Sequence, residues 1–193
     1  MPTLELLVTE SHNDAQEQTT GNMNLTVSQS RIGGGQRTGA RFLVPDIPQG
    51  AIINSALAYI QIVPGYTDVS IATTMENSSN ALIFENIQNN IRDRSLGIGD
   101  TIYVNGTTPS DTYILIGDLV TQVQTVVNRG TWVPGNYMVM VVRGQTGTGR
   151  THSWDEDPLR APKLVVTYND LGVVQPIKKI RVGLVPGIRI GVN

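Results

Sequence analysis

The chain contains no cysteine, which excludes a disulfide framework, a zinc–thiolate site and a cysteine nucleophile. Histidine is almost absent as well, since His12 and His152 are the only two in 193 residues. No apolar run approaches the roughly 18 residues that a membrane-spanning helix needs. The N-terminal stretch MPTLELLVTESHNDAQEQ lacks the basic and apolar regions of a signal peptide. We therefore expect no membrane partner, and either an N-terminus that has been trimmed or a protein that reaches its destination without classical secretion.

Charge of either sign is scarce, because charged residues make up only 16% of the chain and the formal net charge is −2. Proteins that bind nucleic acid through surface charge normally carry a basic excess, so no nucleic-acid partner is expected. The charge is also unevenly distributed. Residues 169–193 contain one acid and four bases, a net charge of +3, whereas the preceding residues carry −5.

Short β-prone runs rich in Val, Ile, Thr and Tyr recur along the chain, with glycine and proline between them. They lie at 3–9, 22–32, 38–44, 51–63, 68–73, 80–85, 101–104, 112–116, 136–143 and 163–168. In INSALAYIQIV (53–63) alternate residues share a face, as in a strand that is buried on at least one side. This pattern predicts an all-β fold, an antiparallel jelly-roll-like β-sandwich over residues 1–168, followed by an extended C-terminal arm at 169–193.

One segment, at 117–130, has helical periodicity. Its apolar residues form a single stripe: Leu119, Val120, Val123, Val126 and Val127. Asp118 could cap this helix and Gly130 could end it, although the valines leave a strand as the alternative. By contrast, the glycine-rich RIGGGQRTG (31–39) reads as a flexible connection. It lacks the strand–loop–helix context of a phosphate-binding loop.

Two stretches carry a resemblance to a known family. They are RTGARFLVPDIPQGAIINSALAYIQI and DLVTQVQTVVNRGTWVPGNYMVMVVRG, the latter continuing to SWDEDPLRAPKLVVTY. Residues 1–168 resemble the carbohydrate-binding-module-like jelly-roll sandwiches that occur as repeats in extracellular bacterial proteins. Similar sandwiches serve as virion surface proteins of tailed bacteriophages, a setting that requires no export signal. A shared fold does not fix a function, so the site residues must be weighed separately.

Two clusters of oxygen ligands could hold calcium if their loops meet at one end of the sandwich. Asp14 and Glu17 lie in ESHNDAQE (10–17), and Asp155 and Asp157 lie in SWDED (153–157). Solvated acidic loops are the competing interpretation, and no other cofactor is expected. THSWDED (151–157) also places His152 beside Ser153. Adjacent residues do not face one another as a catalytic triad requires, so the protein is expected not to be an enzyme.

Aromatic residues, which stack on the faces of sugar rings in glycan-binding sites, make up only 5% of the chain. Trp154, beside the acidic loop, is the main candidate for carbohydrate binding. Tyr66 and Tyr103 are weaker candidates, and Trp132 is expected to pack in the core over the end of the helix.

The C-terminal arm is β-patterned twice, in IRVGLV and in IRIGV, with Pro186 and Gly187 between the two halves. It cannot bury its own apolar residues, and an exposed strand of this kind pairs readily with another chain. Its predicted partner-binding residues are Ile180, Arg181, Val182, Leu184, Ile188, Arg189 and Ile190. The sequence therefore predicts a homo-oligomer, a trimer in the phage setting, that contacts a major capsid protein or another virion protein.

Three functions remain open at this point. The leading hypothesis is a non-enzymatic capsid decoration (cement) or head-fibre subunit located in a phage virion. The alternative is a carbohydrate-binding module of a bacterial surface or secreted protein, which would act outside the cell on surface glycans. A bacterial surface protein that self-assembles into fibres is the third.

Overall fold

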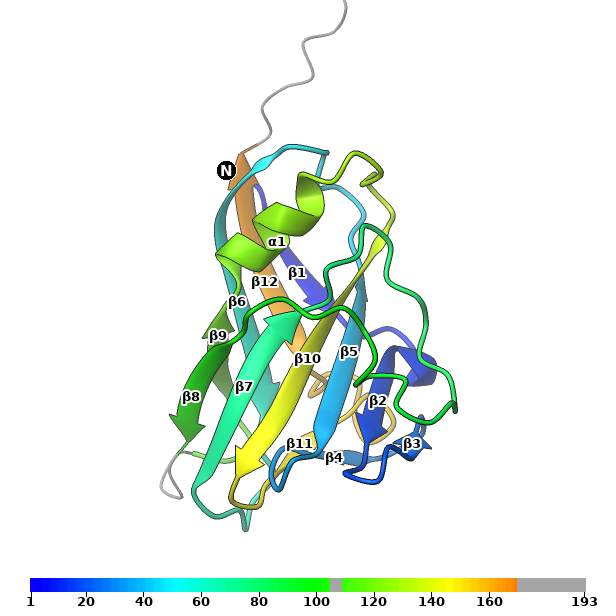
Figure 1. The fold of residues 1–193 in the computed structure, drawn as a ribbon. Helices are drawn as coiled ribbons and strands as arrows, with labels where there is room; N and C mark the ends of the chain where they lie inside the picture. The colour runs from blue at the N-terminus through cyan, green and yellow to red at the C-terminus, as the bar shows by residue number, and fades with distance from the viewer. Residues whose placement is uncertain (105–108, 170–193) are drawn as a thin grey trace, which may run out of the picture.

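Two antiparallel β-sheets pack face to face in the computed structural model, which describes residues 1–104 and 109–169 (Figure 1). The elements are β1 Thr3–Leu7, the 3-10 turn η1 Ser11–Asn13, β2 Asp14–Glu17, β3 Met23–Asn24, β4 Gln29–Arg31, β5 Arg37–Leu43, β6 Ile52–Gln61, β7 Val69–Met75, β8 Asp100–Val104, β9 Tyr113–Asp118, α1 Val120–Val127, β10 Tyr137–Thr146, β11 Arg150–His152 and β12 Lys163–Asn169. The predicted all-β sandwich with one short helix is confirmed. The predicted C-terminal arm lies outside the described residues, apart from Asn169, which ends β12.

The strand order is that of a jelly roll. One sheet runs β1-β12-β6-β9 and the other β3-β2-β5-β10-β7-β8, while β4 and β11 form a separate two-stranded sheet. When the short β2, β3, β4 and β11 are set aside, the remaining eight strands can be numbered 1 to 8 along the chain. The two sheets then read 1-8-3-6 and 2-7-4-5. This order corresponds to two Greek keys folded over each other.

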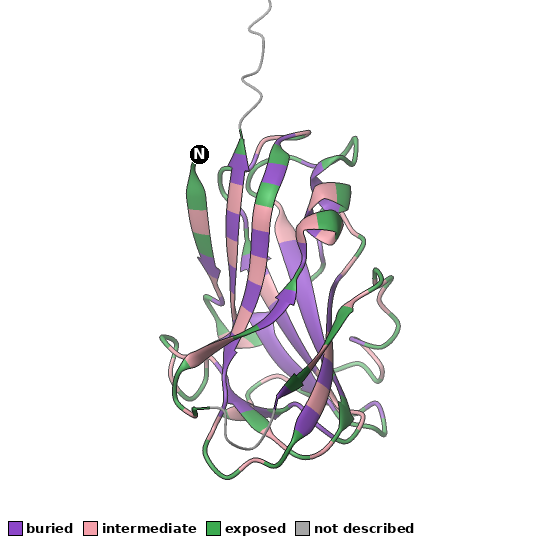
Figure 2. Cartoon of the chain, turned by 90° about the vertical axis from the view of Figure 1, so that its left-hand side faces the viewer, coloured by how far each residue is buried: buried purple, intermediate pink, exposed green. Residues whose placement is uncertain are grey.

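The main core lies between the two sheets. Buried residues alternate with less buried ones along β6 and β12 of the four-stranded sheet (Figure 2). On β6 the buried face holds Ala56, Ala58 and Ile60, as the alternation in the sequence predicts. Trp132 closes one end of this core. Its side chain is fully buried and its indole N–H donates to the backbone oxygen of Ile47 at 2.9 Å. Its predicted core position is confirmed.

A second apolar cluster lies on the outer face of the six-stranded sheet, under the segment 77–97. It contains Ala15, Ala81, Phe84, Ile91, Val139 and Val141. Residues 80–85 were predicted to be a strand, and this is wrong. The guanidinium of Arg94 donates to the backbone oxygens of Leu82 and Ile83 at 2.9 and 3.1 Å, so a side chain satisfies carbonyls that would otherwise need a neighbouring strand.

The strand predicted at 22–32 is divided into β3 and β4. A turn separates them, and within it the backbone N–H of Thr26 donates to the side-chain oxygen of Asn24 at 3.1 Å. Such asparagine turns compete with strand pairing. The division matters because it lets β4 leave the main sheet and pair with β11.

The predicted helix is confirmed as α1, and the buried side of its stripe packs into the main core. Leu119 occupies the N-cap position, and the Asp118 carboxylate accepts from the backbone N–H of Val120 at 3.1 Å. The helix ends at Val127, and its C-cap residue, Asn128, lies two residues before Gly130. None of the helices within the described residues is long and apolar enough to cross a membrane.

The sandwich has two distinct ends, and β6 runs from one to the other. At one end Ile52 pairs with Asn169, the last described residue. At the other end Ile62 forms a bridge with Thr151 of β11. A strand of ten residues at about 3.3 Å per residue separates these points by roughly 30 Å. The described chain therefore ends at the pole opposite β4 and β11 (Figure 1).

Candidate functional site

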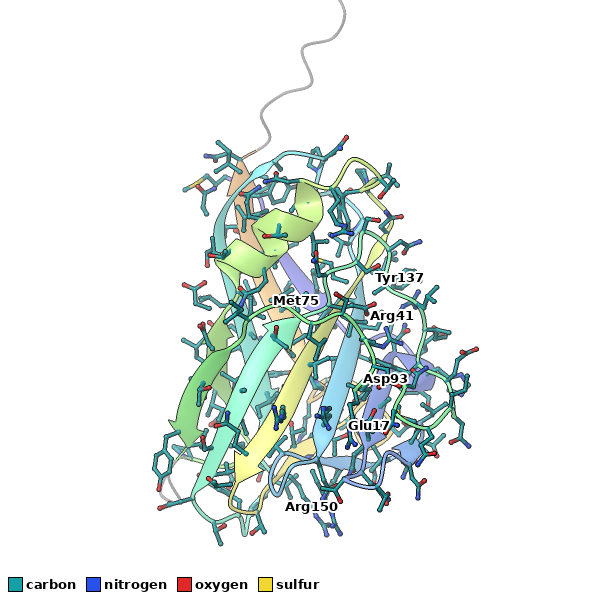
Figure 3. All side chains as sticks on the ribbon, viewed as in Figure 1. Glu17, Arg41, Met75, Asp93, Tyr137 and Arg150 are labelled. Carbon is teal, nitrogen blue, oxygen red and sulfur yellow. The ribbon has the colours of Figure 1, made fainter. Side chains whose placement is uncertain are left out.

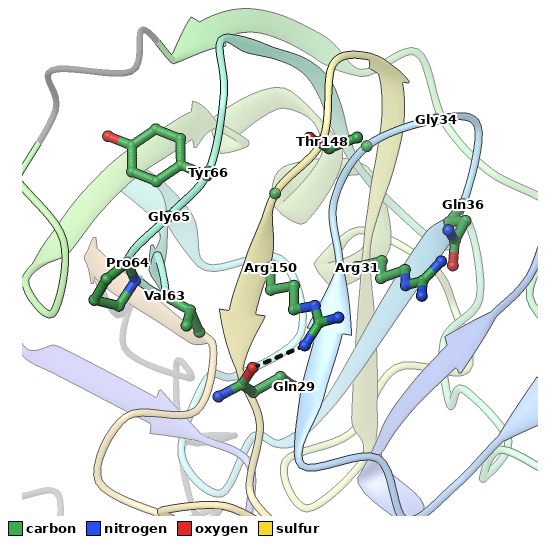
Figure 4. Close-up of a pocket in the computed structure, with 12 residues that line it drawn as sticks. Gln29, Arg31, Gly34, Gln36, Val63, Pro64, Gly65, Tyr66, Thr148 and Arg150 are labelled. Atoms are coloured by element: carbon green, nitrogen blue, oxygen red, sulfur yellow. Dashed lines mark hydrogen bonds between the residues drawn. The ribbon is translucent and has the colours of Figure 1, made fainter.

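Two hollows that share lining residues lie around the small sheet formed by β4 and β11. Figure 4 shows the residues that line the first of them. The volumes of the two hollows are about 520 and 560 Å³, and four residues line both of them: Gln29, Arg31, Gln36 and Arg150. We call the two hollows together the arginine groove. Its remaining lining residues are Gln16, Gln18, Thr19, Asn24, Val27, Ser28, Gly33, Gly34, Val63, Pro64, Gly65, Tyr66, Thr148 and Gly149.

Close backbone packing between two glycine-containing turns fixes the groove. The turn at 33–35 lies against the segment 144–149. A Cβ on Gly33 would stand 2.3 Å from the backbone oxygen of Gly147, and one on Gly144 would stand 2.6 Å from the Gly33 backbone. Only glycine permits such an approach. The expectation of a flexible connection at 31–39 therefore missed this packing.

Arg31 and Arg150 lie directly opposite each other on β4 and β11. Directly opposed residues of an antiparallel pair project from the same face, and two like charges in these positions destabilise the pair. Neither guanidinium forms an ion pair with any residue that the structure describes. Among the described residues, the one hydrogen bond from these guanidiniums goes to an amide: Arg150 Nη1 donates to Gln29 Oε1 at 3.4 Å. Two arginines thus face each other without a compensating carboxylate.

A second opposed arginine pair lies at the same end, where Arg37 of β5 faces Arg143 of β10. The Arg37 guanidinium stands 3.5 Å from the buried carboxylate of Glu17, which also lies 3.3 Å from Arg92. The pKa of Arg37 is lowered, first by burial and then by the positive charge of Arg92. Figure 3 places Glu17 and Arg150 at this end of the molecule. The Glu17 carboxylate is therefore already engaged by Arg37 and Arg92.

No aspartate or glutamate lines either hollow among the residues that the structure describes. Those residues hold ten of the 14 basic and 15 of the 16 acidic residues of the chain, so they carry a net charge of −5. The groove lining, with two arginines and no acidic residue, is therefore positively charged in a part of the chain whose net charge is negative. The lining also has five amide side chains and an aromatic wall, Tyr66, which is half-buried and packs against the core.

The four carboxylates predicted as calcium ligands are only partly brought together. Asp14 is fully buried and lies close enough to Asp155 for the second charge to act on it. The pKa of Asp14 is raised to about 7, mainly because the carboxyl group is buried. The hydrogen bond from the backbone N–H of Trp154 lowers this pKa, and the negative charge of Asp155 raises it. Ser11 donates to both oxygens of Asp155 at 2.8 and 2.9 Å.

The other two predicted ligands have different surroundings. Glu17 is held by its arginines, and it accepts hydrogen bonds from the backbone N–H groups of Ile91 and Arg92 at 2.8 Å each. Asp157 accepts from the backbone N–H of Leu159 and forms an ion pair with Arg160. Within the described residues, no three His, Asp or Glu side chains form a group that could hold a metal ion.

His152 is buried and contacts two carboxylates rather than a hydroxyl. Its Nε2 lies 2.9 Å from Asp111 and its Nδ1 lies 2.6 Å from Glu156. The hydroxyl of Ser153 donates to the backbone oxygens of Val27 and Ser28. The side chains of His152 and Ser153 therefore have different partners.

The aromatic candidates for sugar binding are separated in the structure. Tyr66 lines the arginine groove. Trp154 is half-buried and packs against the main core. Its backbone N–H donates to Asp14 at 2.8 Å. Tyr103 is exposed on β8, and its hydroxyl donates to Asp68. Of the three, only Tyr66 shares a hollow with the arginines.

Arg31 and Arg150 were not predicted from the sequence as site residues. A signal was present, because each arginine lies within two residues of a glycine turn, in RIGGG and in GTGR. The sequence alone did not show that β4 pairs with β11, a pairing that joins positions more than a hundred residues apart.

The predicted partner-binding residues of the C-terminal arm lie outside the described residues. They are Ile180, Arg181, Val182, Leu184, Ile188, Arg189 and Ile190.

Comparison with known proteins adds no family. No protein-family model matches the chain, and no curated protein matches it either.

Proposed function

We propose that this protein is a non-enzymatic structural subunit of a bacteriophage virion, a capsid decoration (cement) or head-fibre protein that assembles through residues 169–193. The observation that carries the proposal is the polarity of the sandwich. Asn169 lies at the pole opposite the arginine groove, roughly 30 Å away along β6. A body attached through its C-terminal segment at one pole would present the groove pole to the surroundings.

Charge supports assembly through the same segment. Residues 170–193 carry +3 and the described residues carry −5. Opposite charges on two parts of one chain favour contacts between copies and speed their encounter. The twofold β pattern of residues 180–192 suits addition to a neighbour's sheet edge. The oligomer we expect is a trimer, and its binding partner is a major capsid protein or another virion protein.

The test is a truncation that ends at Asn169, which leaves β12 intact. Light scattering after gel filtration would give the oligomeric state, and co-sedimentation would measure binding to undecorated phage capsids. We expect the truncated protein to be monomeric and to lose capsid binding. A matched control is the full chain with Arg181→Gln and Arg189→Gln. These substitutions should weaken both oligomer formation and capsid binding while the arm itself is retained. Assembly and capsid binding equal to the full chain would contradict the proposal.

A second candidate function is a carbohydrate-binding module of a bacterial surface or secreted protein, located outside the cell. The observation that favours it is the groove lining of amides beside Tyr66, because glycan sites combine amide hydrogen bonds with an aromatic face. The resemblance of residues 1–168 to carbohydrate-binding-module-like sandwiches points the same way. A glycan array probed with the wild type and with Tyr66→Ala would test it. An array without hits would count against it.

A further inference from the structure

We propose that the arginine groove binds an acidic polysaccharide, and that Arg31 and Arg150 together hold one carboxylate or sulfate group of the sugar chain. The inference does not depend on assembly through residues 169–193, because every residue that carries it belongs to the opposite pole. Two arginines placed directly opposite each other on a two-stranded sheet repel, and a sheet selected for stability alone would pair one of them with an acid.

An anionic group between the two guanidiniums would remove this repulsion. Guanidinium groups bind carboxylate and sulfate-like oxygens through parallel N–H bonds, and such charge-assisted bonds are among the strongest in proteins. Arg31 and Arg150 line both hollows, so a single charged group between them would lie at the centre of the groove. The close-up shows both side chains, with Gln29 bonded to Arg150 and Gln36 near Arg31 (Figure 4).

The rest of the lining indicates a saccharide. Amides and hydroxyls suit the hydroxyl groups of a sugar ring, and the groove supplies five amides together with Thr19, Ser28 and Thr148. Tyr66 and Pro64 form an apolar wall on the other side of Arg150 from Gln36 (Figure 4). The two hollows adjoin, so a chain longer than one sugar could occupy both.

Nucleic acid is disfavoured as the ligand. A strand of DNA or RNA carries one negative charge per nucleotide and needs an extended basic track. Beyond the groove, the described residues carry a net negative charge that would repel such a polyanion. A polysaccharide whose charged groups are spaced along the chain can be bound by the Arg31–Arg150 pair alone, without an extended basic surface.

The experiment uses the full chain and a set of matched polymers, with binding measured by isothermal titration calorimetry at two salt concentrations. Polygalacturonate supplies carboxylates, dextran sulfate supplies sulfates, and neutral dextran shares the backbone of the latter. We expect binding to one or both acidic polymers that weakens with salt. We expect no binding to dextran and weaker binding to a single-stranded DNA oligonucleotide.

The variants locate the site. Arg31→Gln with Arg150→Gln removes two charges from the groove, and Arg181→Gln with Arg189→Gln removes two from the C-terminal segment. The groove variant should bind at least about ten- to a hundredfold more weakly, because each arginine contributes a charged hydrogen bond. Because the C-terminal substitutions are expected to weaken assembly, the control is compared with the wild type at concentrations where both have the same oligomeric state, and there it should bind each acidic polymer as the wild type does. The melting temperature of the groove variant distinguishes lost binding from lost folding. This variant should melt at the same temperature as the wild type or higher, because the repulsion between the two arginines is gone.

Each outcome bears on the proposal. Loss of acidic-polymer binding in the groove variant alone would support it. Equal binding of dextran, or tighter binding of DNA, would overturn the ligand class. Loss of binding in the C-terminal variant alone would place the anion site outside the groove. Failure of the wild type to bind either acidic polymer would also overturn the proposal.

Discussion

The carboxylate of Asp14 is fully buried beside the loop that follows β11, and its Oδ2 accepts a hydrogen bond from the Trp154 backbone N–H at 2.8 Å. The second oxygen of Asp14, Oδ1, has no hydrogen-bond partner in the structure. An ionised carboxylate in such a place is poorly solvated, which explains why its pKa is raised to about 7. Burial in the folded protein therefore favours the protonated form of Asp14, although the hydrogen bond from Trp154 opposes this.

Stability should consequently depend on pH through Asp14. The pKa of this group is about 7 in the folded protein and near 3.8 when unfolded, so between these values the folded state binds more protons. Stability from this group is full below pH 4 and falls as pH rises toward 7. The loss is on the order of 4 kcal/mol at pH 8. Asp14→Asn should be more stable than the wild type at pH 8, with little difference at pH 4.

The measurement is urea denaturation of both proteins across pH 4 to 8. The difference between the two free energies of unfolding isolates Asp14 from the other carboxylates, which titrate alike in both. Asp155→Asn is the control, because Asp155 is exposed and contributes only a secondary part of the shift. A difference between the wild type and Asp14→Asn that does not change with pH would refute the assignment.

Glu17 should be the most costly charge to remove. Its carboxylate is completely buried between Arg37 and Arg92 and also accepts two backbone N–H groups from the segment 77–97. Glu17→Gln would leave Arg37 beside Arg92 and Arg143 with no negative partner. Removing one member of a buried ion pair typically costs about 3 to 5 kcal/mol. Thermal unfolding should show this loss, and amide hydrogen exchange should show faster opening at 91–92.

A matched control for this variant is Arg92→Gln, which removes the more exposed arginine and leaves the pair with Arg37. Its effect should be smaller than that of Glu17→Gln, within about 1 kcal/mol. Equal effects of the two substitutions would mean that the free energy does not arise from burial of the carboxylate.

The fold could be predicted from the sequence where the pattern is local. The alternation in 53–63 indicated β6, and the stripe at 119–127 indicated α1, because both periods reflect one buried face. The strand predicted at 80–85 failed for a non-local reason, since Arg94 supplies hydrogen bonds that no local pattern announces.

The candidate site was less predictable, for a related reason. Arg31 and Arg150 are adjacent only because β4 leaves the main sheet and pairs with β11. The acidic residues, in contrast, form conspicuous clusters in the sequence. In the structure they lie apart: Asp14 faces the loop at Trp154, and Glu17 faces the segment 77–97. Residues three apart on a strand point to opposite faces, so one cluster was divided between two surroundings.

Trp132 offers a test of the core at the end of α1. Trp132→Phe keeps most of the apolar contact but removes the indole N–H, which leaves the buried carbonyl of Ile47 without its donor. We expect a loss of about 1 to 3 kcal/mol for this change and about 3 to 5 kcal/mol for Trp132→Ala. Thermal unfolding followed by circular dichroism would measure both. A loss for Trp132→Phe as large as that for Trp132→Ala would mean that packing contributes little.

The last prediction connects backbone packing to the groove. In Gly144→Ala the new methyl group would stand 2.6 Å from the backbone of Gly33, and neither backbone segment can move without disturbing the hydrogen bond from Gly144 N–H to Gln36. Overpacking of this kind costs about 1 to 3 kcal/mol. Gly130→Ala is the control, because a Cβ there meets nothing within 4 Å. Because Gly33 and Gln36 line the groove, Gly144→Ala should weaken binding of acidic polymers as well, even at temperatures where it is fully folded. If it melts early but binds normally, the glycine contact stabilises the fold without shaping the groove.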